Sequence, residues 1–175
     1  MKVSKCHLEG ILLIEPITHA DDRGFFLESF ERERYRELGI TEDFVQDNHS
    51  RSRKNVLRGL HFTKNKPQAQ ILTVMRGRIF DVVVDIRKGS LTFGKWFGAE
   101  LGDEGLRQIY IPHGFAHGFC VLSEFADLHY KVSQRYDPGG ECGIIWNDIE
   151  IKIDWPVREP LISERDLRHQ RLEDI

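Results

Sequence analysis

The sequence predicts an all-β chain folded as an antiparallel sandwich or barrel. Short apolar runs separated by turn signals fill the chain from residue 44 onward, and signals for helices are thin. Several of these runs alternate with the period of two that marks a strand with one buried face. The runs predict strands or extended segments at residues 10–16, 25–30, 44–48, 56–62, 71–75, 79–86, 96–101, 108–111, 115–122, 128–133 and 144–146.

One short helix is predicted before the run of strands. Residues 31–38 are charged, and Tyr35 and Leu38 are spaced to share one helical face. Gly39 follows, and glycine is the residue that most often ends a helix. The segment is therefore expected to form a small helix near the N-terminus.

Alternation indicates which strand faces are buried. In residues 78–86 one parity is wholly apolar and predicts a core face. The other parity mixes Asp81 and Asp85 with apolar residues, so this face is either solvated or lines a polar cavity. In residues 115–121, His117 shares the bulky parity with aromatic residues, which suggests a cavity wall.

The segment 55–62 puts an arginine and a histidine into an apolar strand. Such a strand avoids Arg58 and His61 unless they have partners. A cleft that binds an anion and needs a base near neutral pH would use both side chains. They have opposite parity, however, so they share a cavity only if Gly59 marks a bulge or a twist.

Length, charge and cysteine content bound the class of protein. At 175 residues we predict one domain covering 1–175. The net charge of −3 arises from 25 basic and 28 acidic residues spread along the chain, which argues against nucleic acid. Three cysteines without metal-like spacing, and no signal peptide or membrane span at the N-terminus, predict a cytoplasmic protein.

No metal site is predicted. A metal-holding small barrel would show His-x-His with a later carboxylate and a further histidine, but Phe62 and Thr63 follow His61. His113 and His117 are four residues apart, but they lie across a Pro-Gly turn rather than on one helical face. A phosphate loop that opens a helix and a Gly-x-Ser-x-Gly elbow are also missing.

Each candidate for chemistry also has a structural interpretation. His61 is either a general base or a core histidine bonded to a backbone carbonyl. Asp166 is either its carboxylate partner or a first-turn acid, and Tyr130 is either functional or an amphipathic core residue. Four arginines could together hold phosphates, although each alone is more often a surface ion pair: Arg23, Arg58, Arg107 and Arg165. The polar triplet Gln46, Asp47 and Asn48 could bind a base or a sugar and is equally suited to a turn.

Several longer stretches together are similar to the dTDP-4-dehydrorhamnose 3,5-epimerase family, in family order over nearly the whole chain. The matching stretches are residues 22–28, 44–50, 56–62, 80–87, 111–119, 122–123, 130–131, 146–148 and 163–166.

This resemblance implies a cupin-type jelly roll that forms homodimers, in which an N-terminal strand commonly joins the partner's sheet. It implies a nucleotide-diphospho-sugar substrate and no metal or organic cofactor. It further implies that His61 is the base, that Asp166 supports it, and that Tyr130 is the proton donor on the opposite side. The positions that fall where the family contacts its substrate are Arg23, Glu28, Gln46, Asp47, Asn48, Arg58, His117 and Glu141.

Three positions depart from the family pattern. Gln70 stands where a substrate-contacting lysine is usual, Arg165 replaces the lysine before the late aspartate, and Arg135 stands where an aromatic residue is common. Gln70 and Arg165 stay among the expected substrate-binding residues. Three alternatives stay open: a mono-epimerase acting on a different sugar, such as a CDP- or GDP-linked one, a non-catalytic nucleotide-sugar binder, and a metal-dependent cupin oxygenase or isomerase.

Overall fold

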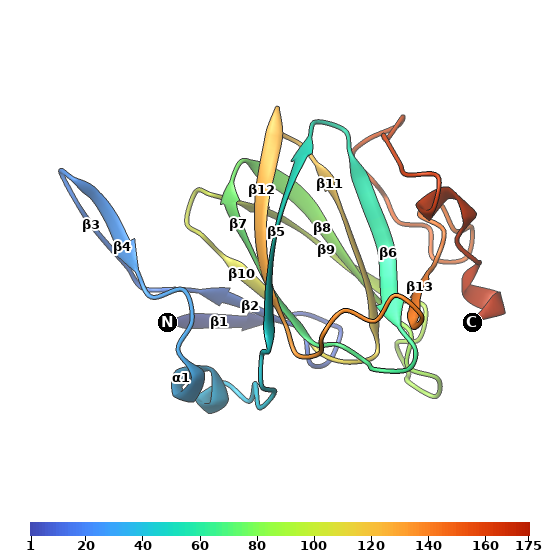
Figure 1. The fold of residues 1–175 in the computed structure, drawn as a ribbon, viewed down its shortest axis with the longest axis horizontal. Helices are drawn as coiled ribbons and strands as arrows, with labels where there is room; N and C mark the ends of the chain where they lie inside the picture. Colours follow the sequence, from blue (N-terminus) through green and yellow to red (C-terminus); the bar gives the residue numbers. More distant parts are fainter.

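Two antiparallel sheets face each other in a computed structural model that describes residues 1–175, and they form a jelly roll (Figure 1). This confirms the all-β prediction. The six-stranded sheet has the order β1-β2-β10-β7-β12-β5, and the five-stranded sheet has the order β13-β6-β11-β8-β9. The strands are β1 (Lys2–Lys5), β2 (Leu12–Glu15), β3 (Thr18–Asp21), β4 (Gly24–Leu27), β5 (Gln46–Arg53), β6 (Leu57–Thr63), β7 (Gln70–Arg76), β8 (Arg78–Asp85), β9 (Trp96–Gly102), β10 (Gln108–Ile111), β11 (Phe115–Val121), β12 (Phe125–Val132) and β13 (Glu141–Gly143).

Helical structure is short, as the sequence predicts. Helix α1 (Arg32–Glu37) is capped by the Glu31 carboxylate, which accepts hydrogen bonds from two backbone N–H groups of the first turn. Its single buried residue, Tyr35, donates a hydrogen bond to Gln108 at 2.5 Å and thereby fastens the helix to β10. Two 3₁₀ turns, η1 (Asp166–Arg168) and η2 (Leu172–Asp174), lie near the C-terminus.

The core is split by the five-stranded sheet, and the predicted core face of β8 is confirmed in the outer of its two parts. The apolar face of β8, with Val82 and Val84, lies on the outside of the sheet, where Ile144 and Leu172 of the C-terminal segment cover it. The parity with Asp81 instead points between the sheets, together with the main apolar cluster. Strand β8 is therefore buried on both faces, and its carboxylates are not solvated.

The predicted strand at 144–146 is wrong. The ladder with β6 is made by Glu141–Gly143. Ile144 beyond it still exchanges two backbone hydrogen bonds with Leu60 of β6, and it also forms an isolated parallel bridge with Gln170. The C-terminal segment, drawn in red in Figure 1, runs along this edge, and its Gln170 carbonyl accepts the Ile145 N–H at 2.8 Å.

A two-stranded hairpin formed by β3 and β4 projects from the body of the molecule (Figure 1). Its aromatic residues Phe25 and Phe26 are 63% and 71% exposed. Strand β1 pairs with β2 of the same chain. The helices of the chain are all too short and too polar to cross a membrane.

Candidate active site

A β-bulge in β6 brings Arg58 and His61 to the same side of the sheet. His61 pairs with His117 of β11, but Arg58 pairs with Phe119, so β6 has one residue more than β11 between these pairs. Gly59 adopts φ +117°, and a Cβ there would lie 2.6 Å from the Cα of Gly118. The glycine predicted to mark a bulge thus does so, because only glycine fits this backbone and this close approach.

The His61 imidazole is held by Asp166. Its Nε2 lies 3.0 Å from Asp166 Oδ1, and the Gly59 N–H donates to Oδ2 at 3.2 Å. An ionised carboxylate only accepts hydrogen bonds, so His61 carries its proton on Nε2 and presents the free lone pair of Nδ1. The bulge therefore has two effects: it orients His61, and its Gly59 N–H fixes the Asp166 carboxylate.

Asp166 stays ionised although it is buried. Burial alone would raise the pKa of this carboxyl, but the hydrogen bond and charge of His61 and the Gly59 N–H together lower it well below its usual range. The residue opens the turn η1, where the Ser163 hydroxyl accepts the Asp166 N–H at 3.1 Å. The helical turn implied by the first-turn interpretation of Asp166 is thus a single 3₁₀ turn.

A cavity of about 700 Å³ opens between the two sheets. His61 lines it from the five-stranded sheet, and Tyr130 of β12 lines it from the six-stranded sheet. Burial, and to a smaller degree the charge of Glu141, raise the pKa of the Tyr130 phenol, so it stays protonated. The structure brings most of the predicted site residues to this cavity: Gln46, Asn48, Arg58, His61, Gln70, His117, Tyr130, Glu141 and Arg165.

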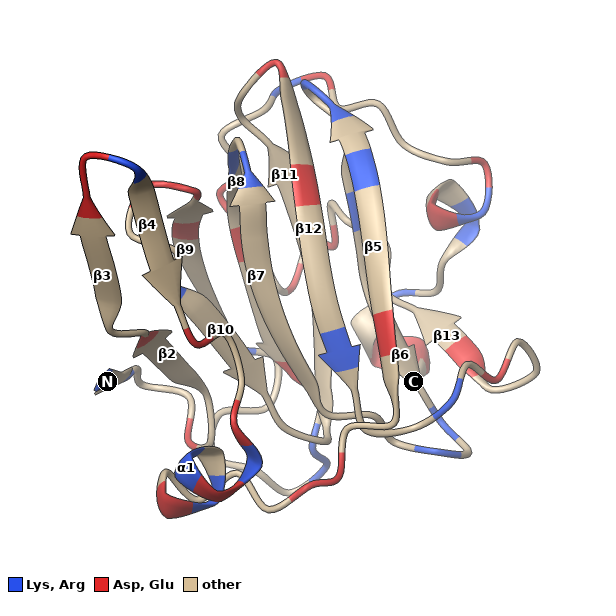
Figure 2. Ribbon diagram, turned by 60° about the vertical axis from the view of Figure 1, so that its left-hand side comes forward, with Lys and Arg blue, Asp and Glu red and all other residues tan.

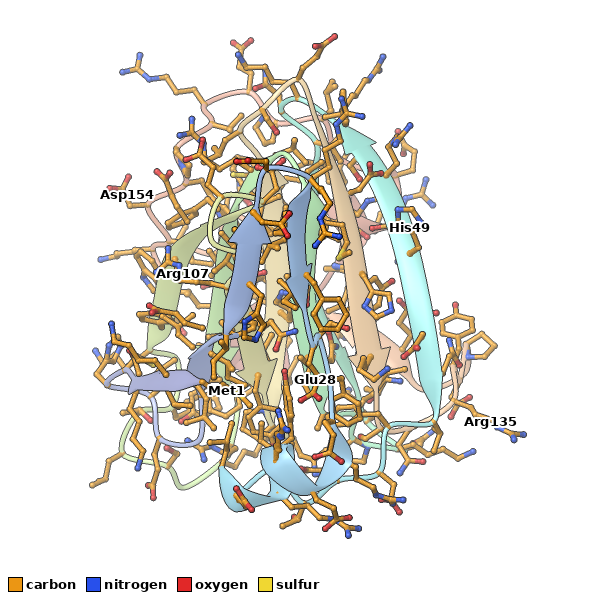
Figure 3. All side chains as sticks on the ribbon, turned by 90° about the vertical axis from the view of Figure 1, so that its left-hand side faces the viewer. Met1, Glu28, His49, Arg107, Arg135 and Asp154 are labelled. Carbon is orange, nitrogen blue, oxygen red and sulfur yellow. The ribbon has the colours of Figure 1, made fainter.

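Three predicted substrate-binding residues lie away from the cavity within this chain. Asp47 has the outward parity of β5 and pairs with Lys131 at 2.7 Å, among the charged positions spread along β5 and β12 (Figure 2). Arg23 pairs with Asp21 at the tip of the hairpin. Glu28, labelled in Figure 3, lies below the hairpin and pairs with Arg34 at 3.0 Å.

A second histidine–aspartate pair, which the sequence reasoning missed, lies in the same cavity. His117 Nε2 is 2.8 Å from Oδ2 of Asp81, whose side chain is fully buried and whose Oδ1 has no hydrogen-bond partner. The signal was present in the mixed parity of β8, which left a polar cavity as one of two interpretations. His61 and His117 are cross-strand partners, so the two imidazoles share one wall.

Charged groups surround one end of the cavity. Arg165 donates to Glu141 at 2.9 Å, and the Tyr136 hydroxyl donates to the same carboxylate oxygen at 2.9 Å. Together with Arg58, this gives the cavity two guanidinium groups, which are suited to bidentate binding of a diphosphate. Tyr136, which lines the cavity and is more than half exposed, offers an aromatic face at its edge.

A trio that includes His61 has the residue types of a metal site. Donor atoms of His61, Asp166 and His169 lie within 4.8 Å of one another. The Arg165 guanidinium, however, lies 3.5 Å from both Asp166 Oδ1 and His61 Nε2. A permanent cation at this distance opposes a second one, so the trio fits proton transfer better than metal binding.

Comparison with known proteins gives the family. Residues 5–174 match the profile of the family described as dTDP-4-dehydrorhamnose 3,5-epimerase. The dTDP-4-dehydrorhamnose 3,5-epimerase of Shigella flexneri is 49% identical, over 99% of this chain and 97% of that protein. The dTDP-4-dehydrorhamnose 3-epimerase of Streptomyces niveus is 43% identical, over 95% of this chain and 81% of that protein.

A solved structure agrees with the sequence comparison. The dTDP-6-deoxy-D-glucose-3,5-epimerase of Legionella pneumophila, in complex with dTDP-4-keto-L-rhamnose, superposes with a TM-score of 0.97 at 46% identity. The match covers 99% of this chain and 94% of that structure. With profile, sequence and fold in agreement over almost the whole length, this chain belongs to the dTDP-4-dehydrorhamnose 3,5-epimerase family of isomerases.

Proposed function

We propose that this chain epimerises a dTDP-linked 4-keto-6-deoxyhexose at carbons next to the ketone, with His61 as base and Tyr130 as acid. The relatives described above are named for dTDP sugars, which supports this nucleotide over CDP or GDP. They also include a 3-epimerase beside 3,5-epimerases. We infer inversion at both C3 and C5, with inversion at C3 alone as the second candidate.

The observation that carries the proposal is that His61 and Tyr130 line one cavity from opposite sheets. Inversion of a carbon centre needs a base on one face of the sugar ring and a proton donor on the other. An imidazole held by a buried carboxylate suits the first task, because its free nitrogen can accept a proton and the carboxylate stabilises the charge that results. A buried phenol that stays protonated suits the second.

The proposed reaction moves protons only. His61 Nδ1 takes the proton from the carbon beside the ketone, and the electron pair of the broken C–H bond forms an enolate on the former carbonyl. Asp166 stabilises the imidazolium that results. Tyr130 then gives its hydroxyl proton to the opposite face of the same carbon, and the carbonyl re-forms. Solvent returns a proton to the phenolate, and the His61 imidazolium releases the abstracted proton to solvent, so both side chains regain their starting states.

Two further groups of residues support binding in this scheme. Arg58 and Arg165 are proposed to hold the diphosphate, and the Gln70 amide is proposed to donate a hydrogen bond to the enolate oxygen. The amide stabilises a negative oxygen less than the lysine that is usual in the family. Gln46, Asn48 and His117 complete the proposed contacts to the nucleotide-sugar.

Proton NMR in deuterated buffer tests the proposal with a dTDP-4-keto-6-deoxyhexose. We expect the native chain to incorporate deuterium at C3 and C5. In His61→Ala we expect no deuterium at either carbon. His7→Ala, which removes an exposed imidazole outside the cavity, is the matched control and should keep exchange. Thermal stabilisation by the sugar nucleotide without any exchange would instead support a non-catalytic binder.

We further propose a homodimer in which the hairpin of one chain reaches the other chain's cavity. Support comes from the exposed Phe25 and Phe26 and from Arg23 and Glu28, which are expected substrate contacts yet lie outside the cavity. Mixing Arg23→Ala subunits with His61→Ala subunits tests this, since a hybrid dimer keeps one intact site. Recovery of about a quarter of native exchange is expected, because random mixing makes about half of the dimers hybrids and each hybrid has one intact site of two. A monomer in solution, or no recovery, would refute it.

A further inference from the structure

His169 contacts the His61–Asp166 pair from a segment that the sequence reasoning did not single out. Its imidazole meets that of His61 with ring centroids 5.4 Å apart and planes at 86°. Its side chain is only 12% exposed, and its Nε2 lies 3.9 Å from Asp166 Oδ1. The third histidine is thus built into the wall behind the proposed base.

The backbone around His169 fixes its position. The next residue, Gln170, bridges to Ile144 beyond β13, and its carbonyl accepts the Ile145 N–H at 2.8 Å. Across this bridge, Gly143 leaves room for the imidazole, because a Cβ on Gly143 would lie 2.2 Å from His169 Nδ1. The missing side chain at Gly143 and the ring at His169 therefore fit together as one contact.

The buried His169 imidazole forms no hydrogen bond. Nδ1 is buried without a partner, and the 3.9 Å from Nε2 to Asp166 is too long for a hydrogen bond. Burial, and then the nearby His61, lower the pKa of His169, so it stays neutral beside its neighbour. What the ring offers to the site is therefore its shape and its edge-to-face contact.

We propose that His169 is a positioning residue whose buried ring keeps the His61 imidazole aligned with Asp166. This inference rests on the proposed function, because it matters only if His61 is the base. Without the ring, His61 would gain space to rotate away from Asp166, and water would reach the pair. The neutral state of His169 also adds no second positive charge next to the imidazolium formed during the reaction.

Four variants test the inference by steady-state kinetics with the dTDP-4-keto sugar. His169→Ala should lower kcat on the order of tenfold with KM within about twofold, because misplacement of a base affects chemistry rather than binding. Gly143→Ala should do the same with His169 still present, since the added methyl displaces the ring. His169→Phe keeps an aromatic ring and should stay within about threefold of the native kcat, whereas His169→Leu should resemble His169→Ala.

A spectroscopic reading separates positioning from general destabilisation. The native chain should show a downfield proton for His61 Nε2–H bonded to Asp166, and His169→Phe should keep it. The signal should be broadened or lost in His169→Ala and Gly143→Ala. If His169→Ala fails to fold, the contrast between the Phe and Leu variants decides the question in its place.

Two results would overturn the inference. One is native kcat in folded His169→Ala or His169→Leu, and the other is a loss in His169→Phe as large as that in His169→Leu. His61→Ala keeps failure of the parent proposal distinct. If His61→Ala still exchanges deuterium, the base is wrongly assigned; if it does not and the His169 variants are native-like, only the present inference fails.

Discussion

The two histidine–aspartate pairs of the cavity have their histidines side by side on one sheet, yet they are built differently. In the His61–Asp166 pair, the carboxylate comes from the C-terminal turn η1, 105 positions away in the chain, and both of its oxygens have partners. In the His117–Asp81 pair, the carboxylate comes from the adjacent strand β8, and one of its oxygens has none. The His61 side chain is 28% exposed, whereas that of His117 is 10% exposed.

This difference indicates that His61 is suited to proton transfer and that His117 is suited to a fixed binding contact. A base must remain accessible and must be stabilised when it becomes charged, and Asp166 with its several donors can do this. A buried imidazole with a single fixed partner suits recognition, since its free nitrogen then points in one direction. The comparison predicts that damage to the first pair affects kcat and that damage to the second affects KM.

The largest expected effect is the loss of kcat on replacing His61, and His117 is the histidine to compare with it. His61→Ala should lower kcat by about a thousandfold, the size typical of losing a general base, while KM changes little. His117→Ala should lower kcat by about tenfold at most and raise KM, because only a binding contact is lost. Measured kcat and KM for both variants check this. Equal losses of kcat would remove the functional distinction between the pairs.

A smaller but still large effect is expected for Asp166→Asn. The amide keeps the shape of the side chain but can offer its oxygen or its NH₂ group to His61, so the tautomer with a free Nδ1 is no longer enforced. We expect kcat to fall on the order of a hundredfold with KM nearly unchanged. Asp127→Asn, which changes a carboxylate outside the cavity, is the matched control and should keep native kcat.

The stability of the same pair should depend on pH. The pKa of Asp166 is lowered in the folded chain from its ordinary value of 3.8. Its contribution is therefore fully present above about pH 4 and is lost as the pH falls through the lowered pKa. The free energy of unfolding should thus fall less below pH 4 in Asp166→Asn than in the native chain. Denaturant melts between pH 3 and pH 6 measure the difference, and parallel curves would contradict it.

How far the sequence predicted these pairs follows from the range of each contact. Alternation within β8 is enough to predict a polar cavity beside Asp81 as one of two interpretations, because successive residues of a strand point to opposite faces. The bulge at Gly59 is also predictable, because Arg58 and His61 have opposite parity and can line one cavity only if the strand is irregular between them. The role of Asp166 came from family resemblance alone, because no local pattern joins residues so far apart in the chain.

The features that the sequence did not predict have one origin. The C-terminal segment covers the outer face of β8, so the wholly apolar parity with Val82 faces away from the cavity. The same segment ends β13 at Gly143 and brings His169 against His61. Strand periodicity cannot predict either result, because both depend on where an irregular segment without periodicity is placed.

A moderate effect is expected for Asp81→Asn. The amide can still accept the Nε2–H of His117, but the negative charge disappears and the orientation of the ring is less strongly fixed. We expect kcat/KM to fall by about tenfold, mainly through KM, since the predicted contact of His117 is with the substrate. Titration of the sugar nucleotide by calorimetry with this variant measures the binding part directly. A loss confined to kcat would assign chemistry to the second pair as well.

The smallest expected effect concerns Gln70, which lines the cavity at the start of β7, whereas both histidines lie on the opposite sheet. Gln70→Lys restores the ammonium usual in the family and should stabilise the enolate oxygen more than an amide does, raising kcat by about threefold. His61 and Tyr130 are unchanged in this variant. The ratio of the deuterium exchange rates at C3 and C5 should therefore change only if enolate formation limits the rate at one of the two carbons. Gln68→Lys adds the same charge at the rim and is the matched control. An increase in both variants would mean that general attraction of the diphosphate, rather than the enolate, limits the reaction.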